Sequence, residues 1–277
     1  MQLPRQLLGS RAELEEFSRQ LASGVYYGDH RLLCRLWGEV PIFVDTHDYM
    51  LAPRLVLDGF WEAWVTLAIA HYLQRGMWCV DVGASYGYYT LLMALACGPE
   101  GRVLACEPNP LLAEVYLPAN LALNGFHQGV EICPKVIGDR EREQVEFVLH
   151  RNDSAVSSLE QWAYSHRAES IQVPMTTVDH LCADWPRLDL VKIDAEGAEA
   201  LVWDGMQRTL QKFPHAVVVL ELHLPRDPQQ TKELLEEIVE EGYALRHIDY
   251  QGFVRPASMQ TILENPHEHW TLWLRKN

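Results

Sequence analysis

Hydrophobic and polar positions change period repeatedly along the chain, and the alternation predicts a parallel β-sheet flanked by helices. Short and mostly apolar runs, typical of strands buried on both faces, occur at 77–83, 102–108, 130–138, 188–194 and 216–223. Apolar residues at helical spacing occur between them, at 60–72, after Gly87, at 111–125, from Glu196 and at 227–241. Residues 139–186 follow neither period, and we expect them to be irregular. The expected fold class is α/β with a mostly parallel sheet.

The two ends of the chain depart from this alternation. Residues 13–22 have the spacing of an amphipathic helix, and the runs 31–37 and 41–46, joined through Gly38, predict a β-hairpin. We therefore expect an N-terminal extension over residues 1–58, acting as a cap or a dimer contact, before a main domain over residues 59–277. The closing runs 243–249 and 269–276 predict an antiparallel pair of strands at the sheet edge.

Composition narrows the class of protein. The chain has 277 residues, 48% of them hydrophobic, which is enough to bury a full core. The net charge is −15, and Lys and Arg form no block that could follow a phosphate backbone, so nucleic acid is not an expected partner. The six cysteines include no C-x-x-C pair and are expected to be reduced thiols in the core. An apolar leader and an apolar run of about eighteen residues are both absent, which predicts a cytoplasmic protein without a membrane span.

The turn that follows the first apolar strand carries the first candidate site. It reads V-D-V-G-A-S-Y-G and lacks the second glycine of the dinucleotide pattern G-x-G-x-x-G. Asp81, near the strand end, would repel a pyrophosphate but accepts a ligand with a cationic sulfur and an ammonium group. Glu107 ends the next strand, where a carboxylate can accept both hydroxyls of an adenosine ribose. The pair is compatible with S-adenosylmethionine, although Asp81 alone is equally typical of a turn or capping carboxylate.

A second candidate site lies in V-K-I-D-A-E-G-A-E, residues 191–199. Period two places Lys192 and Asp194 on one face of a buried strand, and a lysine in that position normally requires a partner. On the following strand Glu221 and His223 share a face, so they are expected at the same rim of the sheet. A structural network of ion pairs is the alternative to a catalytic role, and a single histidine at a strand end is more often structural.

Taken together, these segments resemble the FkbM family of S-adenosylmethionine-dependent methyltransferases. The resemblance runs from about Gly59 to His223, and is carried by V-D-V-G-A-S-Y-G-Y-Y-T, A-C-E-P-N-P, L-P-A-N-L-A-L-N-G, N-D-S-A-V-S-S-L, T-T-V-D-H-L and V-K-I-D-A-E-G-A-E followed by W-D-G-M-Q-R-T-L. It implies a class I methyltransferase fold of the Rossmann-like kind and methylation of oxygen, commonly a hydroxyl of a sugar, polysaccharide or polyketide. One position departs from the family pattern, which often has asparagine where this chain has Ser85.

The resemblance also implies roles for single residues. The implied donor contacts are Glu62, Asp81, Gly83, Ala84, Ser85, Gly87, Glu107, Asn109, Val136, Ile137 and Ser154. In this scheme the glycines let the backbone approach the donor, Asp81 orients its methionine end and Glu107 holds its ribose. The implied catalytic residues are Asp194, His223, Lys192 and Glu196. Asp194 or His223 would be the general base, and the other two would set the local field.

The sequence therefore predicts an S-adenosyl-L-methionine-dependent O-methyltransferase that acts on a small molecule or a glycan. Carboxyl and nitrogen acceptors stay open, because the acceptor atom depends on the pocket and not on the donor motif. Two other classes also stay open: a nucleotide-dependent oxidoreductase, disfavoured by the missing glycine, and a non-catalytic donor-binding protein, disfavoured by the intact K-x-D-x-E-G-x-E segment. No metal is predicted, since no ligand set has a recognised spacing. A homodimer is a further alternative.

Overall fold

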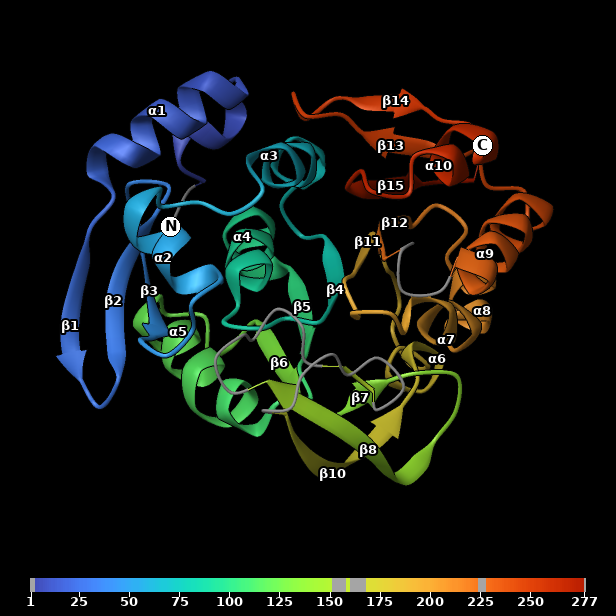
Figure 1. Cartoon of the computed structure of the whole chain (residues 1–277), viewed down its shortest axis with the longest axis horizontal. Helices are drawn as coiled ribbons and strands as arrows, with labels where there is room; N and C mark the ends of the chain where they lie inside the picture. Colours follow the sequence, from blue (N-terminus) through green and yellow to red (C-terminus); the bar gives the residue numbers. More distant parts are fainter. Residues whose placement is uncertain (1–2, 151–157, 160–167, 224–227, 277) are drawn as a thin grey trace.

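The computed structural model describes residues 3–150, 158–159, 168–223 and 228–276, and an eight-stranded sheet lies at its centre (Figure 1). The strand order is β14-β13-β15-β12-β11-β4-β5-β6. The strands are β4 (Trp78–Val82), β5 (Arg102–Cys106), β6 (Val130–Cys133), β11 (Leu190–Ile193), β12 (Val217–Leu222), β13 (Arg246–Ile248), β14 (Val254–Pro256) and β15 (Trp270–Leu274). Strands β6, β5, β4, β11 and β12 run parallel, whereas β15 is antiparallel to its neighbours β12 and β13.

Period two along the central strands buries a different set of side chains on each face of this sheet. On one face, Val217 and Val219 join a core with α3 (Ala63–Tyr72), α4 (Tyr88–Cys97) and α5 (Leu117–Leu123). On the other face, Val218 and Leu220 join a second core. The helices of that second core are α6 (Val178–Leu181), α7 (Glu199–Asp204), α8 (Gln207–Lys212), α9 (Pro228–Glu240) and α10 (Met259–Glu264). The sheet is therefore the middle of three layers.

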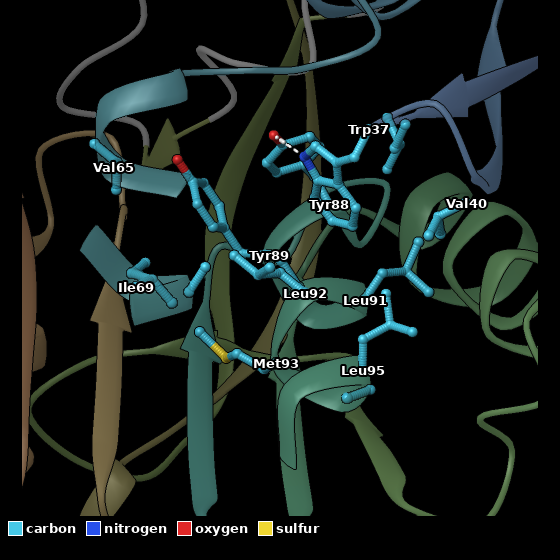
Figure 2. Close-up of a cluster of buried hydrophobic side chains, with 14 of the residues drawn as sticks. Trp37, Val40, Val65, Ile69, Tyr88, Tyr89, Leu91, Leu92, Met93 and Leu95 are labelled. Atoms are coloured by element: carbon cyan, nitrogen blue, oxygen red, sulfur yellow. Dashed lines mark hydrogen bonds between the residues drawn. The ribbon is translucent and has the colours of Figure 1, made fainter. Parts of the chain in front are cut away.

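The N-terminal residues form a second, three-stranded antiparallel sheet beside the first core (Figure 1). Its elements are a 3-10 turn (Arg5–Leu8), α1 (Arg11–Leu21), β1 (Gly24–Gly28), β2 (Arg31–Leu36), β3 (Val40–Asp45) and α2 (Leu51–Leu57). Trp37, in the β2–β3 turn, packs edge-on against Tyr88 of α4 at 5.0 Å between ring centroids, and its Nε1 donates to the Tyr88 hydroxyl at 2.7 Å (Figure 2). The extension and the first layer of helices on the central sheet thus share one core.

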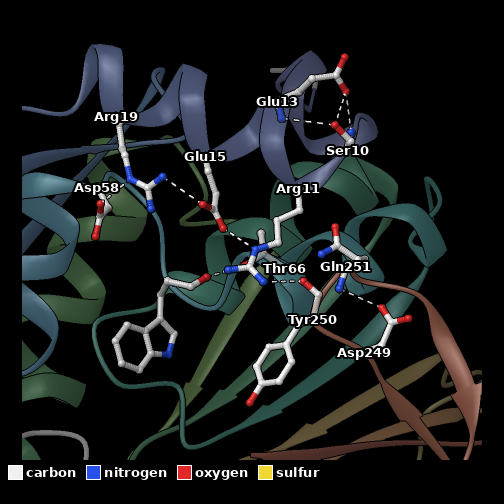
Figure 3. Close-up of polar contacts among 11 residues, drawn as sticks. Ser10, Arg11, Glu13, Glu15, Arg19, Asp58, Thr66, Asp249, Tyr250 and Gln251 are labelled. Carbon is white, nitrogen blue, oxygen red and sulfur yellow. Dashed lines mark hydrogen bonds and ion pairs between the residues drawn. The ribbon is translucent and has the colours of Figure 1, made fainter.

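Helix α1 also joins the extension to the far end of the chain. Ser10 caps it in a capping box with Glu13. The guanidinium of the next residue, Arg11, donates to the carbonyl of Tyr250, in the turn between β13 and β14, at 2.6 Å (Figure 3). The same guanidinium lies over the Trp64 ring of α3. These contacts fix α1 across the N-terminal end of α3.

The expectation that residues 139–186 are irregular was wrong. They contain β8 (Arg142–His150), β9 (Ser158–Leu159) and β10 (Ala168–Thr176), which with β7 (Val136–Ile137) form a third sheet in the order β7-β10-β8-β9. Strand β8 reads R-E-Q-V-E-F-V-L-H, and its first half is exposed. A strand that rests on a small apolar cluster does not need the continuous apolar run of a central strand, and for this reason the pattern did not reveal it.

Several boundaries also differ from the sequence-based expectations. The run 130–138 divides into β6 and β7, which belong to different sheets. The β2–β3 hairpin is confirmed, but β1 was missed. The closing strands do pair antiparallel, but β14 takes the edge and β15 lies inside the sheet. The helix expected from Glu196 begins at Glu199, because Glu196 (φ +52°) and Gly197 (φ +103°) have left-handed backbones. In the described part of the chain, every helix is too short or too polar to cross a membrane.

Candidate active site

A pocket opens at the carboxyl ends of the parallel strands, beside β4. The neighbours of β4 are β5, which follows it in the chain, and β11, which comes much later, so the strand order reverses at this point. Open parallel sheets bind ligands at such a switch point, where consecutive loops diverge. The lining includes Leu51, Trp61, Glu62, Gly83, Ala84, Ser85, Tyr89, Glu107, Lys135, Val136, Ile137, Phe147, Leu159, Lys192, Asp194, Glu196 and Glu221.

The turn after β4 is held by backbone hydrogen bonds. The amides of Gly83 and Ala84 both donate to the carbonyl of Cys106, the last residue of β5, at 3.0 Å. The Ser85 amide donates to Oε2 of Glu107 at 2.8 Å, and the Asn109 amide donates to Oε1 at 2.9 Å. A carboxylate oxygen has more than one lone pair, so each oxygen of Glu107 can accept a further hydrogen from a ligand in the pocket.

The two glycines of the turn are required by the protein's own packing. A Cβ on Gly83 (φ +81°) would lie 2.0 Å from the backbone oxygen of Asp194. A Cβ on Gly87 (φ +92°) would lie 2.6 Å from Cδ1 of Leu117. Gly83 therefore allows the turn after β4 to approach the end of β11, and both glycines have a structural reason that does not involve a donor.

Three charged residues occupy the sheet face that α3 and α4 cover. Asp81, Lys192 and Glu221 each stand one position before the end of their strand, in β4, β11 and β12. Lys192 is the register partner of Asp81. Its Nζ donates to Oδ2 of Asp194 at 3.0 Å and lies 4.5 Å from the centroid of the Tyr89 ring. The lysine is 2% exposed, so the predicted need for a partner is met by a carboxylate and an aromatic face.

Glu62 adds a carboxylate from the segment before α3. The hydroxyl of Tyr89, on α4, donates to Oε2 of Glu62 at 2.8 Å. Asp81 lies deeper, directly before the lining residues Val82 and Gly83, and is 1% exposed. Thr90 donates to its Oδ2 at 2.6 Å, whereas Oδ1 has no hydrogen-bond partner among the described residues. An unsatisfied buried carboxylate oxygen favours a cationic or hydrogen-donating ligand nearby.

His223 follows β12 and stands among three carboxylates. Nδ1 lies 2.9 Å from Oε1 of Glu199, which also accepts the Gly197 amide at 2.9 Å. Nε2 lies 3.5 Å from Oε2 of Glu196 and 3.9 Å from Oε1 of Glu221. His223 is not among the residues that line the pocket, although Glu196 and Glu221 are.

Burial and charge act in opposite directions on the pKa values in this region. Burial raises the pKa of Glu62, Asp81 and Glu221 above their ordinary values, even though the charge of Lys192 opposes this. Burial would lower the pKa of His223, but the charge and hydrogen bond of Glu199, together with the charge of Glu196, raise it to about 10.

The pocket also concentrates strained backbone. Glu62 (φ +37°), Ser85 (φ +50°) and Glu196 (φ +52°) are non-glycine residues in left-handed conformations, and all three line it. Such conformations cost of order 1–3 kcal/mol each and persist where the surrounding structure imposes them, often at functional sites. Ser85 occupies the position where the family pattern often has asparagine, a residue that tolerates this region better than serine.

Most of the residues predicted from the sequence lie at the pocket. Glu62, Gly83, Ala84, Ser85, Glu107, Val136, Ile137, Lys192, Asp194 and Glu196 line it. Asp81, Gly87, Asn109 and His223 lie outside the lining; Asn109 contributes its amide to Glu107 and its side chain to the Leu111 amide. Ser154 lies outside the described residues. Lining residues that the sequence did not suggest include Tyr89 and Phe147, whereas Glu221 was already expected at this rim of the sheet.

The fold and the pocket define the protein as a class I methyltransferase. The sheet has the reversal beside β4 and an antiparallel strand, β15, inserted next to β12. A carboxylate ends the second strand, where it can face the ribose of S-adenosyl-L-methionine.

The chain belongs to the FkbM methyltransferase family. The family profile described as the methyltransferase FkbM domain matches residues 81–245. A protein-L-isoaspartate O-methyltransferase of Aeropyrum pernix is 44% identical over 66 residues, which is 24% of this chain and 24% of that protein. The similar solved structures include the methyltransferase FkbM from Methylobacillus flagellatus, with 12% identity, 77% of this chain and 54% of that chain covered, and a TM-score of 0.46. They also include the O-methyltransferase TomG from Streptomyces achromogenes, with 16% identity, 78% and 79% covered, and a TM-score of 0.44.

The residues of the pocket fit the methyl donor of this family, S-adenosyl-L-methionine. The donor has a cationic sulfonium and an ammonium group, and the pocket has a surplus of carboxylates with an unsatisfied Asp81 oxygen beneath it. The donor also has a ribose. The carboxylate of Glu107, held at the end of β5, has lone pairs left to accept the ribose hydroxyls. The six cysteines are free thiols, and all of them are buried, as predicted.

Proposed function

We propose that this methyltransferase acts on a hydroxyl oxygen of a small molecule, a sugar or polysaccharide, or a polyketide-type product. The observation that carries the proposal is the carboxylate of Asp194, which lines the pocket with one oxygen fixed by Lys192 Nζ at 3.0 Å. A neutral hydroxyl is a weak nucleophile and gains from losing its proton as its oxygen is methylated, whereas a neutral amine is nucleophilic enough to attack before it loses one. A positioned proton acceptor therefore suits a hydroxyl acceptor best.

The charge of the lining supports the same choice against a carboxyl acceptor. Glu62, Glu196 and Glu221 line the pocket together with Asp194. Burial raises the pKa of Glu62 and Glu221 and so weakens their part in this. An anionic acceptor would still have to approach the ion-paired carboxylates of Asp194 and Glu196 against like charge. An amine acceptor is the second candidate, because the same carboxylates would attract its cationic form.

Each residue near Asp194 has a proposed part in the reaction. S-adenosyl-L-methionine supplies an electrophilic methyl group, and the acceptor oxygen gives up its proton as it takes that group. We assign the proton to Asp194 and not to His223, because Asp194 lines the pocket and Nδ1 of His223 is directed to Glu199. Lys192 fixes the carboxylate, and Glu196 adds to the local field. Positioning can contribute about 7–11 kcal/mol, and a proton acceptor about 10² to 10⁴ in rate.

The donor contacts are proposed from the same lining. Glu107 would accept the ribose hydroxyls, and Val136 and Ile137 would lie against the adenine. Glu62, above the buried Asp81, would face the ammonium end. Leu51 brings the extension over residues 1–58 to the pocket wall, which supports a capping role for it. Buried free thiols support a reducing, cytoplasmic location.

The test compares Asp194→Asn with the unaltered chain. Isothermal titration with S-adenosylhomocysteine is expected to give a dissociation constant within about threefold of the unaltered chain, since Asn keeps the shape of the side chain. Transfer of labelled methyl groups to an extract of the native host is expected to fall by about 10² to 10⁴. Asp249→Asn, a surface change in the β13–β14 turn, is the matched control and should keep full turnover.

Two results would contradict the proposal. Unchanged turnover of Asp194→Asn would remove this residue from the reaction. Mass spectrometry of the labelled product would overturn the assignment to oxygen if the methyl group were found on nitrogen.

A further inference from the structure

A mixed set of nitrogen and oxygen ligands lies where β11 and β12 end, and two of its members, Asp194 and Glu196, line the pocket. Asp194, Glu196 and His223 each offer one atom, and these three atoms lie within 4.8 Å of one another. They come from three separate places: the residue after β11, the turn before α7 and the residue after β12. Ligand atoms around a divalent ion with bonds near 2.1 Å lie about 3 to 4 Å apart. The 3.5 Å between Nε2 of His223 and Oε2 of Glu196 already falls within this range.

The histidine is oriented in the way that metal-bound histidines usually are. A histidine ligand commonly directs its second ring nitrogen to a carboxylate, which fixes the ring and its tautomer. Glu199 accepts from Nδ1 at 2.9 Å and is itself held by the Gly197 amide, so Nε2 is the nitrogen that faces Glu196. Glu199 is 6% exposed and lies outside the ligand set, as such a supporting residue would.

The balance of charge is a separate observation that points to a cation. Around Lys192 and His223, carboxylates are supplied by Glu62, Asp81, Asp194, Glu196, Glu199 and Glu221. The methyl donor brings a sulfonium, an ammonium and a carboxylate, a net charge of one. Burial raises the pKa of Glu62, Asp81 and Glu221 and so reduces this negative charge. A divalent ion would offset the charge that remains on Asp194 and Glu196, which line the pocket.

We propose that Asp194, Glu196 and His223 bind one divalent metal ion, such as Mn²⁺, beside the methyl-transfer position, with Glu199 as the positioning residue for the histidine. Its role rests on the proposed function: a hydroxyl oxygen bound to the ion loses its proton more readily, so the ion would orient the acceptor and assist Asp194. Two carboxylates and one imidazole suit Mn²⁺, which accepts both kinds of ligand. The sequence did not suggest this set, because the spacing between Glu196 and His223 corresponds to no recognised motif.

The test measures metal binding without reference to turnover. The full chain is freed of metal with EDTA, dialysed, and titrated with MnCl₂ while the signal of free Mn²⁺ is followed by electron paramagnetic resonance. One ion per chain is expected. Glu196→Gln and His223→Gln should each weaken binding at least tenfold, and Glu199→Gln by about 10- to 100-fold. Glu131→Gln, at an exposed ion pair with Arg102, is the matched control and should bind Mn²⁺ as the unaltered chain does.

The outcomes separate this inference from the proposed function. Loss of Mn²⁺ binding in the three variants, with S-adenosylhomocysteine binding retained as evidence of folding, supports the site. Absence of stoichiometric binding, or binding that the variants leave unchanged, overturns it even if methyl transfer to a hydroxyl is found. If Mn²⁺ binds as expected but no hydroxyl is methylated, the metal site stands and the proposed acceptor class fails.

Discussion

The turn after β4 and the ends of β11 and β12 line one pocket, but different forces hold them. The turn is fixed by backbone hydrogen bonds to Cys106 and Glu107 and by a glycine that has no room for a side chain. The strand ends are fixed by charge, with Lys192 and His223 set among carboxylates. A substitution in the turn should therefore lower stability by steric overlap. A substitution at the strand ends should lower it by leaving a buried charge without its partner.

The largest effect is expected from Gly83→Ala. The new Cβ would lie 2.0 Å from the Asp194 carbonyl oxygen, and the residue would keep a left-handed φ of +81°. Because the obstructing atom belongs to the backbone of β11's end, we expect the free energy of unfolding to fall by roughly 5 kcal/mol or more. Urea denaturation measures this. Gly76→Ala is the control: its φ is +79° but its Cβ would meet nothing within 4 Å, so the loss should be about 1–2 kcal/mol. Equal losses would show that the backbone angle, and not contact with β11, makes Gly83 necessary.

Lys192→Met should have the next largest effect, because it removes charge while it keeps length. Lys192 is 2% exposed and pairs with Asp194, and Asp81 is its register partner. Removing one partner of a buried ion pair typically costs about 3–5 kcal/mol, since the remaining charge is left uncompensated. Lys232→Met removes an exposed pair with Glu236 on α9 and should cost less than about 0.5 kcal/mol. Similar melting temperatures for the two variants would contradict the view that ion pairs stabilise the ends of β11 and β12.

The same contrast explains which parts of the site could be predicted from the sequence. The glycine turn, Glu107 and Lys192 are local features, since each follows from a strand end and its neighbours along the chain. Phe147 was missed because β8 has an alternating and partly exposed pattern that did not indicate a strand. Tyr89 was missed as a lining residue because its position depends on how α4 is placed in the fold.

Some residues predicted from the sequence lie at the pocket and are held there by contacts that the sequence did not indicate. Gly83 was predicted from the need of a backbone to approach the donor, and the structure adds a second requirement, the close approach of this turn to the Asp194 carbonyl. Glu62 was predicted through the family resemblance, but its position depends on a left-handed backbone and on Tyr89, which no local pattern indicates. The sequence could therefore indicate which residues belong to the site. It could not indicate the long-range contacts that hold those residues in place.

A smaller effect is expected from the pH dependence of donor binding. Burial raises the pKa of Glu107 to about 7, and the charges of Asp81 and Asp194 act in the same direction, while the Asn109 and Ser85 amides lower it. A carboxylate that accepts ribose hydroxyls must be ionised, so the protonated form has to lose its proton on binding. Affinity should therefore fall by about tenfold as the pH decreases from 8 to 6.

Calorimetry with S-adenosylhomocysteine across this pH range measures the effect. Glu107→Gln should bind more weakly at pH 8 and lose most of the pH dependence, because an amide does not titrate. Glu131→Gln, on the exposed end of β6, should keep the full pH dependence. If Glu107→Gln kept the pH dependence, another group would be responsible for it. The turn after β4, which backbone hydrogen bonds hold, would then have no pH-sensitive contact with the donor.

The smallest effect is expected from Ser85→Asn, and its sign is the opposite of the others. Ser85 has φ +50°, and its contact with Glu107 is made by the backbone amide, which any residue except proline provides. Asparagine tolerates the left-handed region better than serine, so the free energy of unfolding should rise by a few tenths to about 1 kcal/mol while donor affinity stays within twofold. Ser85→Val, with a β-branched side chain that disfavours this region, should lower it by about 1–2 kcal/mol. If Ser85→Asn instead lost donor affinity, the serine hydroxyl itself would be a donor contact, and the turn would not be held by its backbone alone.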